Sequence, residues 1–202
     1  NERSHYNALG SIFEIEVRSS LGSDWAVCCV NNTGPSNLRD QVDQICRQLG
    51  LPLSGNLFPA ILTDVVLGAT NGDGKLRLAM IEVKGPARSV GLVDYSQMVG
   101  YLQVARRIEV GALLLIEQGA IPSPVSADLK KLINSGRLLV NWRVSSTVFE
   151  EHRNFNAGIC SYVPGGFIDW IDLKRITNPA PKPGLIQPPP GSGTHAAYIA
   201  PP

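Results

Sequence analysis

The sequence predicts an α/β fold in which a central mixed β-sheet is flanked by helices. Its 202 residues suit one such domain with a full core. Short apolar, β-branched runs typical of strands alternate along the chain with amphipathic segments typical of helices. No apolar run approaches the roughly 18 residues of a membrane span, so we expect no membrane partner. The domain is expected at residues 1–177, followed by a C-terminal extension at 178–202.

The first element is expected at residues 10–21. Its apolar side chains lie on or near one helical stripe; they are Leu9, Ile12, Phe13, Val17 and Leu21. A strand is the alternative, because apolar residues also alternate there with Glu14 and Glu16. Further on, the adjacent Cys28 and Cys29 stand in an apolar run and are expected to be strand residues that face opposite ways.

A capped amphipathic helix is predicted at residues 36–49, ended by Gly50 and Pro52. A β-hairpin follows. Its strands are the apolar, β-branched runs 59–67 and 76–83, and residues 71–74 (Asn-Gly-Asp-Gly) supply the positive φ angles of a tight turn.

The second half of the chain begins with an amphipathic helix at residues 94–107 and a buried strand at 110–116. Beyond them we expect a helix at 126–135, a strand at 137–144 in which Trp142 packs, and a turn at 164–166. From residue 178 onward, eight prolines and repeated Gly and Ser predict a linker, or an arm that docks elsewhere.

The predicted hairpin carries the chemistry. Glu82 and Lys84 are two residues apart on one strand, so their side chains emerge on the same side of the sheet. Asp64 comes from the partner strand and can reach that side. Two carboxylates can hold Mg²⁺, and a lysine beside them can position a water or neutralise charge on a phosphate. This combination predicts phosphodiester cleavage.

Asp64, Glu82 and Lys84 in this order resemble the PD-(D/E)xK nucleases, which include many restriction endonucleases, lambda-type exonucleases and archaeal Holliday-junction resolvases. The family pattern is an acid on one strand, a hairpin, then acid-x-Lys on the next strand. Thr63 stands here where the name-giving proline would be. The resemblance implies a restriction-endonuclease-like core in which Asp64, Glu82 and the Val83 carbonyl hold Mg²⁺, with Mn²⁺ as a substitute, and Lys84 assists the attacking water.

Two flanking segments extend this resemblance. Gln97 and Tyr101, four residues apart on the helix after the acid-x-Lys strand, are similar to the Gln-x-x-x-Tyr motif of the lambda-exonuclease branch, which implies a role in orienting the site and the nucleic-acid backbone. The spacing of the N-terminal helix is similar to that of resolvase-type members, which implies that Glu14 is an upstream metal ligand. Glu16 is its rival, because it falls inside the apolar stripe and a buried carboxylate needs a partner or a metal.

The partner implied is nucleic acid, with DNA favoured over RNA by family frequency alone. The alternatives are an RNA endonuclease of the same fold and a catalytically inactive nucleic-acid-binding or assembly module. A net charge of only +1 means that any binding face is local. Its candidate cations are Lys75, Arg77, Arg88, Arg106, Arg107, Lys130 and Lys131.

The remaining expectations concern context. The four cysteines form no Cys-x-x-Cys pair, so no zinc or iron–sulfur site is indicated, and an intracellular location, cytoplasmic or nuclear, is the simplest interpretation. The chain begins with Asn rather than Met, so we expect a larger parent polypeptide; a homodimer is the alternative.

Overall fold

The computed structural model describes residues 2–32, 34, 36–85, 90–116, 126–128, 143–144, 148–149, 151–152, 156–162, 164 and 168–171. Its elements in chain order are η1 (Glu2–His5, a 3₁₀ turn), α1 (Tyr6–Leu21), β1 (Ala26–Asn31), α2 (Leu38–Leu49), β2 (Val65–Thr70), β3 (Arg77–Lys84), α3 (Leu92–Val104), β4 (Val110–Ile116), β5 (Arg143–Val144), β6 (Glu151–His152), β7 (Asn156–Tyr162) and β8 (Ile168–Ile171). Some features predicted from the sequence lie outside the described residues, namely Arg88, Lys130, Lys131, Trp142, most of 126–135 and 137–144, positions 165–166 and the 178–202 extension.

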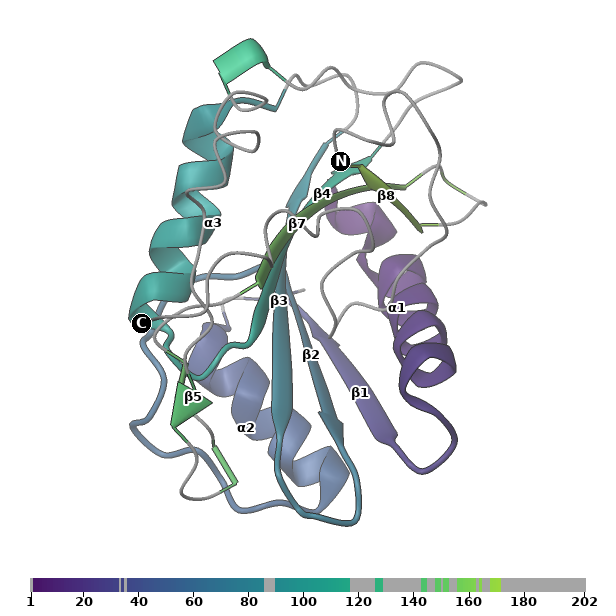
Figure 1. Cartoon of the computed structure of the whole chain (residues 1–202), viewed down its shortest axis with the longest axis vertical. Helices are drawn as coiled ribbons and strands as arrows, with labels where there is room; N and C mark the ends of the chain where they lie inside the picture. The colour runs from purple at the N-terminus through teal and green to yellow at the C-terminus, as the bar shows by residue number, and fades with distance from the viewer. Residues whose placement is uncertain are drawn as a thin grey trace, which may run out of the picture.

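The main sheet has six strands in the order β1-β2-β3-β4-β7-β8 (Figure 1). The pairs β1–β2, β2–β3 and β7–β8 are antiparallel, whereas β3–β4 and β4–β7 are parallel. Strands β5 and β6 form a separate two-stranded ladder. The prediction of a mixed sheet in an α/β fold is therefore confirmed.

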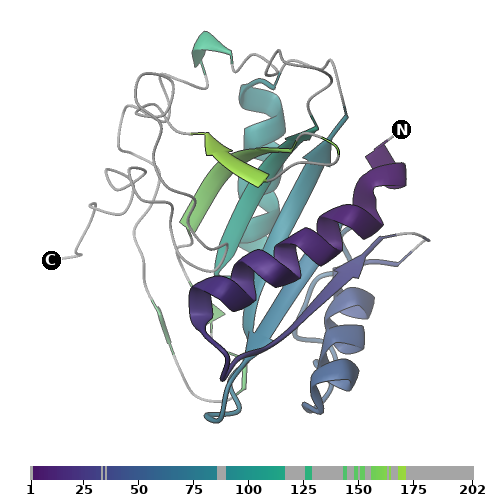
Figure 2. The ribbon, with the colours of Figure 1, turned by 90° about the vertical axis from the view of Figure 1, so that its right-hand side faces the viewer.

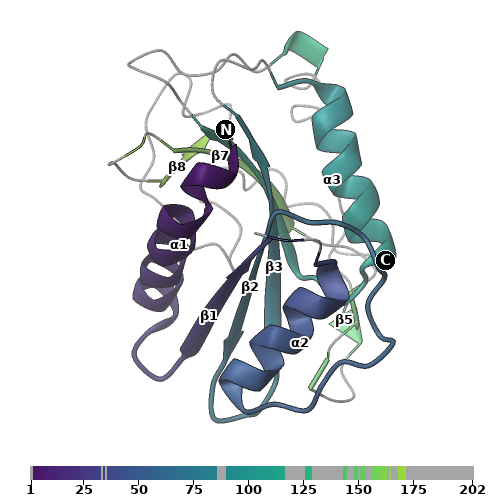
Figure 3. The same cartoon turned by 180° about the vertical axis from the view of Figure 1, so that it is seen from behind.

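Helices cover both faces of this sheet. Figure 2 shows α1 crossing in front of the strands, and Figure 3 shows α2 and α3 on the opposite face. Two buried apolar clusters match this division: one contains Phe13 and Val17 of α1, and the other contains Ile45 of α2 and Met98 of α3. Alternate residues of β3 enter the two clusters, so Ile81 faces α1 whereas its neighbours in the strand face α2 and α3.

The first two helices follow from their patterns. Residues 10–21 are helical, as predicted in preference to a strand, and α1 begins earlier because Tyr6 and Leu9 continue the buried stripe. The Asn37 side chain accepts from the Asp40 N–H at 3.2 Å at the start of α2, and Gly50 ends it in the left-handed conformation with φ +68°.

The hairpin is present, but β2 differs in extent from the predicted run 59–67. Residues before Val65 do not join the sheet, because the Ile61 carbonyl instead accepts from the first N–H of α2, that of Leu38, at 2.7 Å. At its other end β2 continues to Thr70, which pairs with Ala26 of β1. Of the two glycines in this turn, Gly74 has a positive φ angle of +70° and Gly72 does not.

α3 is displaced from the predicted 94–107. It begins at Leu92, and the Asp94 carboxylate accepts from the Gly91 N–H at 3.1 Å. It lies close to the sheet at Gly111 of β4, where an added Cβ would collide with Leu102. This close packing lets side chains of α3 reach the neighbouring strand, β3. No helix among the described residues is long and apolar enough to span a membrane.

Candidate active site

Asp64 is the residue immediately before β2, and its carboxylate is held from two directions. The Tyr6 hydroxyl of α1 donates to Asp64 Oδ1 at 2.6 Å, and the Val83 N–H of β3 donates to Oδ2 at 2.8 Å. Val65 pairs with Ile81, so continuing this antiparallel register places Asp64 opposite Glu82. The two acids thus stand on adjacent chain segments at the same end of the hairpin.

Glu82 and Lys84 form a buried ion pair. Lys84 Nζ lies 2.8 Å from Glu82 Oε1, and both side chains are only 8% exposed. Asp94 of α3 adds a second carboxylate, with its Oδ1 at 3.8 Å from the same ammonium. The prediction that Glu82 and Lys84 share a face is confirmed, and that face is the one covered by α2 and α3.

Electrostatics set the ionisation of Glu82. Burial raises the pKa of its carboxyl above the usual range, and the nearby charges of Asp64 and Glu2 raise it further. The hydrogen bond and charge of Lys84 oppose this rise without cancelling it. The protein therefore compensates the negative charge of an ionised Glu82 only in part. A bound cation would compensate the rest.

The Gln97 side chain reaches Glu82, and the Tyr101 hydroxyl contacts Gln97. Gln97 Nε2 lies 3.4 Å from Glu82 Oε1 and 3.0 Å from the Tyr101 hydroxyl oxygen. Tyr101 is half-buried and packs against the cluster formed with α2 and α3. The helical spacing thus brings Gln97 and Tyr101 together, with Gln97 beside Glu82; their part in catalysis stays a prediction.

The backbone of Val83 completes this corner of the site. In an extended strand the N–H and C=O of one residue point to the same neighbouring strand. Since the Val83 N–H points to Asp64, its carbonyl oxygen faces the same edge of β3. That orientation is compatible with the ligand role that the sequence resemblance implies.

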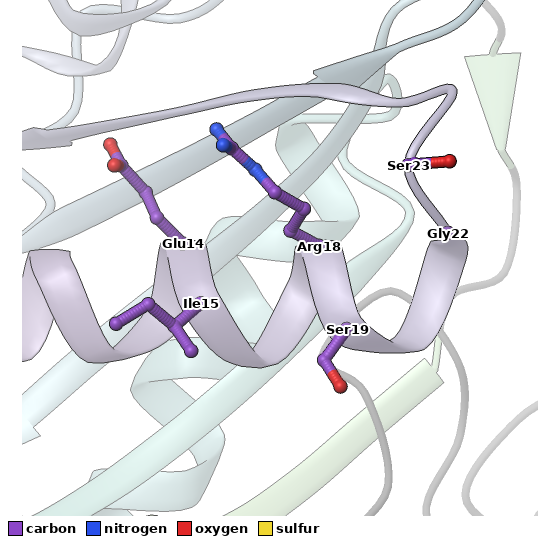
Figure 4. Close-up of a pocket in the computed structure, with 6 residues that line it drawn as sticks. All are labelled: Glu14, Ile15, Arg18, Ser19, Gly22 and Ser23. Carbon is purple, nitrogen blue, oxygen red and sulfur yellow. The ribbon is translucent and has the colours of Figure 1, made fainter.

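Glu14 is not part of this arrangement. Its Oε1 accepts from the Cys29 N–H of β1 at 2.8 Å, and its side chain points from α1 towards that strand (Figure 4). It borders a cavity of about 530 Å³ beside the end of α1. The prediction of Glu14 as upstream ligand is therefore corrected. The reason is geometric: Tyr6 is the α1 residue that touches Asp64, and eight residues of helix carry Glu14 about 12 Å further along the axis. Its rival Glu16 is half-buried still further along α1.

Glu2 is the N-terminal carboxylate that comes to the site instead. Its Oε1 accepts from the Gly85 N–H, directly after Lys84, at 2.7 Å. Together Glu2, Tyr6 and Asp94 are the site neighbours that the sequence did not reveal. Their contacts join positions as many as 83 residues apart, and no local pattern marks them.

The segment before Asp64 is fixed by a buried polar pair. The Thr63 hydroxyl donates to Gln41 Oε1 of α2 at 2.6 Å, and Gln41 Nε2 donates to the Val30 carbonyl of β1 at 3.4 Å. Gln41 and Thr63 are 0% and 1% exposed. Asp64 itself accepts from the Asn32 N–H through its carbonyl at 2.7 Å. Contacts from α2 and β1 therefore determine where the Asp64 side chain begins.

The Asp64 and Glu82 carboxylates and the Val83 carbonyl offer oxygen ligands, which are the kind that Mg²⁺ binds. Among the described residues no group of three or more His, Cys, Asp and Glu side chains is arranged to hold a metal. Mg²⁺ does not require such a group, because it keeps several waters and is commonly bound by one or two carboxylates with substrate phosphates. Oxygen ligands and the raised pKa of Glu82 fit a hard cation.

No family model, curated protein or solved structure matches this chain.

Proposed function

We propose that this protein is a metal-dependent nuclease of the PD-(D/E)xK type that hydrolyses phosphodiester bonds of DNA. The observation that carries the proposal is the meeting of Asp64, Glu82 and Lys84 at one end of the hairpin, with a 2.8 Å ion pair in a buried setting. Gln97 at 3.4 Å from Glu82 supports it, because the Gln-x-x-x-Tyr spacing that contains Gln97 is part of the same resemblance.

Asp64, Glu82 and the Val83 carbonyl would hold Mg²⁺, which when bound stabilises negative charge on the phosphate and the leaving oxygen. Lys84 orients the attacking water and stabilises charge that develops on the phosphate oxygens. Its burial beside Glu82 and Asp94 fixes the ammonium in place, so little reorganisation is needed during the reaction. Gln97 orients the Glu82 carboxylate, and Tyr101 supports Gln97 through its hydroxyl.

The test is a panel of plasmid DNA, single-stranded DNA and RNA, each incubated with Mg²⁺, Mn²⁺ or EDTA. We expect cleavage of DNA with either metal and none with EDTA. Cleavage confined to RNA would replace the proposal with an RNA endonuclease of the same fold. Binding of nucleic acid without cleavage under any condition would favour a catalytically inactive module. The double variant Asp64→Ala/Glu82→Ala controls for a contaminating nuclease, since it should lose all activity.

A further inference from the structure

Two arginines from different elements meet at one loop. Arg39, in the first turn of α2, donates from Nε and Nη2 to the Phe58 carbonyl at 3.2 and 3.1 Å. Arg107, three residues after α3, donates from Nη1 to the Leu57 carbonyl at 3.2 Å. Because Leu57 and Phe58 are consecutive, the two guanidinium groups converge on a single turn of backbone.

Their charges have no counterion in the described part of the chain. Neither Arg39 nor Arg107 pairs there with a carboxylate, in contrast to Arg77, whose Nη2 lies 2.6 Å from Glu109 Oε1. Arg107 Nε is also shielded from solvent and has no hydrogen-bond partner among the described residues. A guanidinium has five N–H donors, so the hydrogen bonds to Leu57 and Phe58 use only two donors of Arg39 and one of Arg107.

The platform beneath the two arginines is firmly packed. The Phe58 side chain is 1% exposed and meets Phe149 edge to face with ring centroids 5.8 Å apart. The Phe58 carbonyl, which accepts from Arg39, therefore belongs to a buried anchor, and the Leu57 carbonyl, which accepts from Arg107, directly precedes it. Such fixing orients the arginines before a ligand arrives and lowers the entropy cost of binding.

The arginines lie on the same face of the sheet as the candidate active site. Leu78 and Met80 of β3 pack in the cluster that α2 and α3 share, and alternation along the strand places Glu82 and Lys84 on that face. Arg39 belongs to α2, and Arg107 follows the helix that carries Gln97. A polymer bound at the active site could thus continue towards Arg39 and Arg107 without crossing the sheet.

We infer that Arg39 and Arg107 form a phosphate-binding site for the backbone of the nucleic-acid substrate, separate from the groups that act on the bond to be cleaved. The inference deepens the proposed function and rests on it for the identity of the ligand. Arginine suits this task because its planar fork can donate two parallel hydrogen bonds to phosphate oxygens. The site supplies local positive charge that the net charge of +1 does not.

The competing explanation is that both arginines only hold the loop at Leu57 and Phe58. The two explanations predict different effects of the side-chain charge at positions 39 and 107 on nucleic-acid binding. Lysine keeps the charge but loses the fork, whereas glutamine can still donate to a carbonyl but is neutral. If the arginines only hold the loop, replacement by lysine and by glutamine should change nucleic-acid binding alike. If they bind phosphate, only the neutral variant should lose the electrostatic part of binding.

The experiment measures binding of fluorescent duplex DNA to the full chain in EDTA, by anisotropy between 50 and 200 mM salt, conditions that prevent metal-dependent cleavage. The variants are Arg39→Gln/Arg107→Gln and Arg39→Lys/Arg107→Lys. Arg18→Gln is the matched control, since Arg18 is an exposed arginine on α1, on the other face of the sheet, and also lacks a carboxylate partner among the described residues. Thermal melts verify that each variant is folded.

We expect the slope of log affinity against log salt to become shallower by about 0.9 for each phosphate that a variant no longer neutralises, hence by about 1.8 in the glutamine double variant. The lysine variant and Arg18→Gln should keep most of the wild-type slope. A glutamine variant with the slope of Arg18→Gln would overturn the inference, even if the wild type cleaves DNA. Arginine-dependent binding without cleavage in Mg²⁺ would instead refute the nuclease proposal and leave the phosphate site standing. A wild type that does not bind duplex DNA in EDTA and cleaves no substrate of the panel with Mg²⁺ or Mn²⁺ would refute both.

Discussion

Replacing Lys84 with methionine tests whether the ion pair at the centre of the site is truly buried. Lys84 and Glu82 are each 8% exposed at the side chain, with 2.8 Å between Nζ and Oε1. Removing one partner of such a pair leaves an uncompensated charge in a poorly solvated place, which costs about 3–5 kcal/mol. An exposed pair contributes only about 0–1 kcal/mol. We therefore expect Lys84→Met to lower the free energy of unfolding by several times the cost expected of a surface ion pair.

The double variant Glu82→Gln/Lys84→Met is the control for this prediction. It removes both charges, so no carboxylate at position 82 is left without its ammonium. Replacing a buried pair by neutral groups of similar volume is often close to neutral for stability. Urea denaturation of the wild type, the two single variants and the double variant should therefore give a large coupling free energy between the two positions.

The pH dependence follows from the raised pKa of Glu82. A carboxyl whose pKa is higher in the folded than in the unfolded state favours folding most below its unfolded value, about 4.3. That contribution is lost as the pH rises through the folded pKa. Lys84 lowers the pKa of Glu82, so its removal raises that pKa further. The deficit of Lys84→Met should thus be smaller at pH 5 than at pH 7.5. A deficit below about 1 kcal/mol at pH 7.5, or one independent of pH, would refute the buried pair.

Three further predictions concern single side chains of the site. Asp64→Ala should lose Mn²⁺ binding measured by calorimetry and Mg²⁺-dependent cleavage; binding equal to wild type would remove Asp64 from the ligand set. Gln97→Ala should reduce the cleavage rate while lowering the free energy of unfolding by no more than about 0.5 kcal/mol. Tyr101→Phe, which keeps the ring and deletes the hydroxyl, should also reduce the cleavage rate. Wild-type cleavage rates in both variants would make the Gln-x-x-x-Tyr motif a coincidence. Tyr6→Phe keeps a ring that is 2% exposed but deletes the donor to Asp64, so Mn²⁺ affinity should fall about 10-fold or more. Tyr95→Phe is the control: Tyr95 is equally buried, but its hydroxyl does not donate to Asp64 in the described structure, so this variant should keep the wild-type affinity.

Most of the regular structure could be predicted because its signals are local. The apolar run at 110–116 coincides with β4, and the cap at Asn37 and the stop at Gly50 bound α2 within the predicted segment. Alternation along β3 placed Glu82 and Lys84 together, and helical spacing placed Gln97 beside Tyr101. Each of these relations spans at most a few residues, so the sequence itself contains the information.

The start of β2 and several neighbours of the site differ from the prediction, because they depend on contacts between residues that are far apart in the sequence. Strand β2 begins late because residues before it bond to α2 rather than to β3, which no pattern within 59–67 indicates. The spacing within one helix indicates Glu14. Where that helix docks on the sheet, however, is set by Tyr6, 58 residues from its partner Asp64. The docking of α1 therefore brings Glu2, rather than Glu14, to the end of β3.

The departure at Thr63 from the PD-(D/E)xK pattern has a physical explanation in the same terms. Proline would restrict the backbone before the acid through its ring, which fixes φ. Here the Thr63 hydroxyl donates to Gln41 at 2.6 Å, and Gln41 also reaches Val30 of β1. Because Gln41 and Thr63 are 0% and 1% exposed, water cannot easily replace this hydrogen bond, and breaking it would leave a buried acceptor unsatisfied at a cost of about 1–3 kcal/mol. A tertiary contact to α2 thus restrains the same segment that a proline would restrain locally. The missing proline is therefore no argument against Asp64 as a site residue.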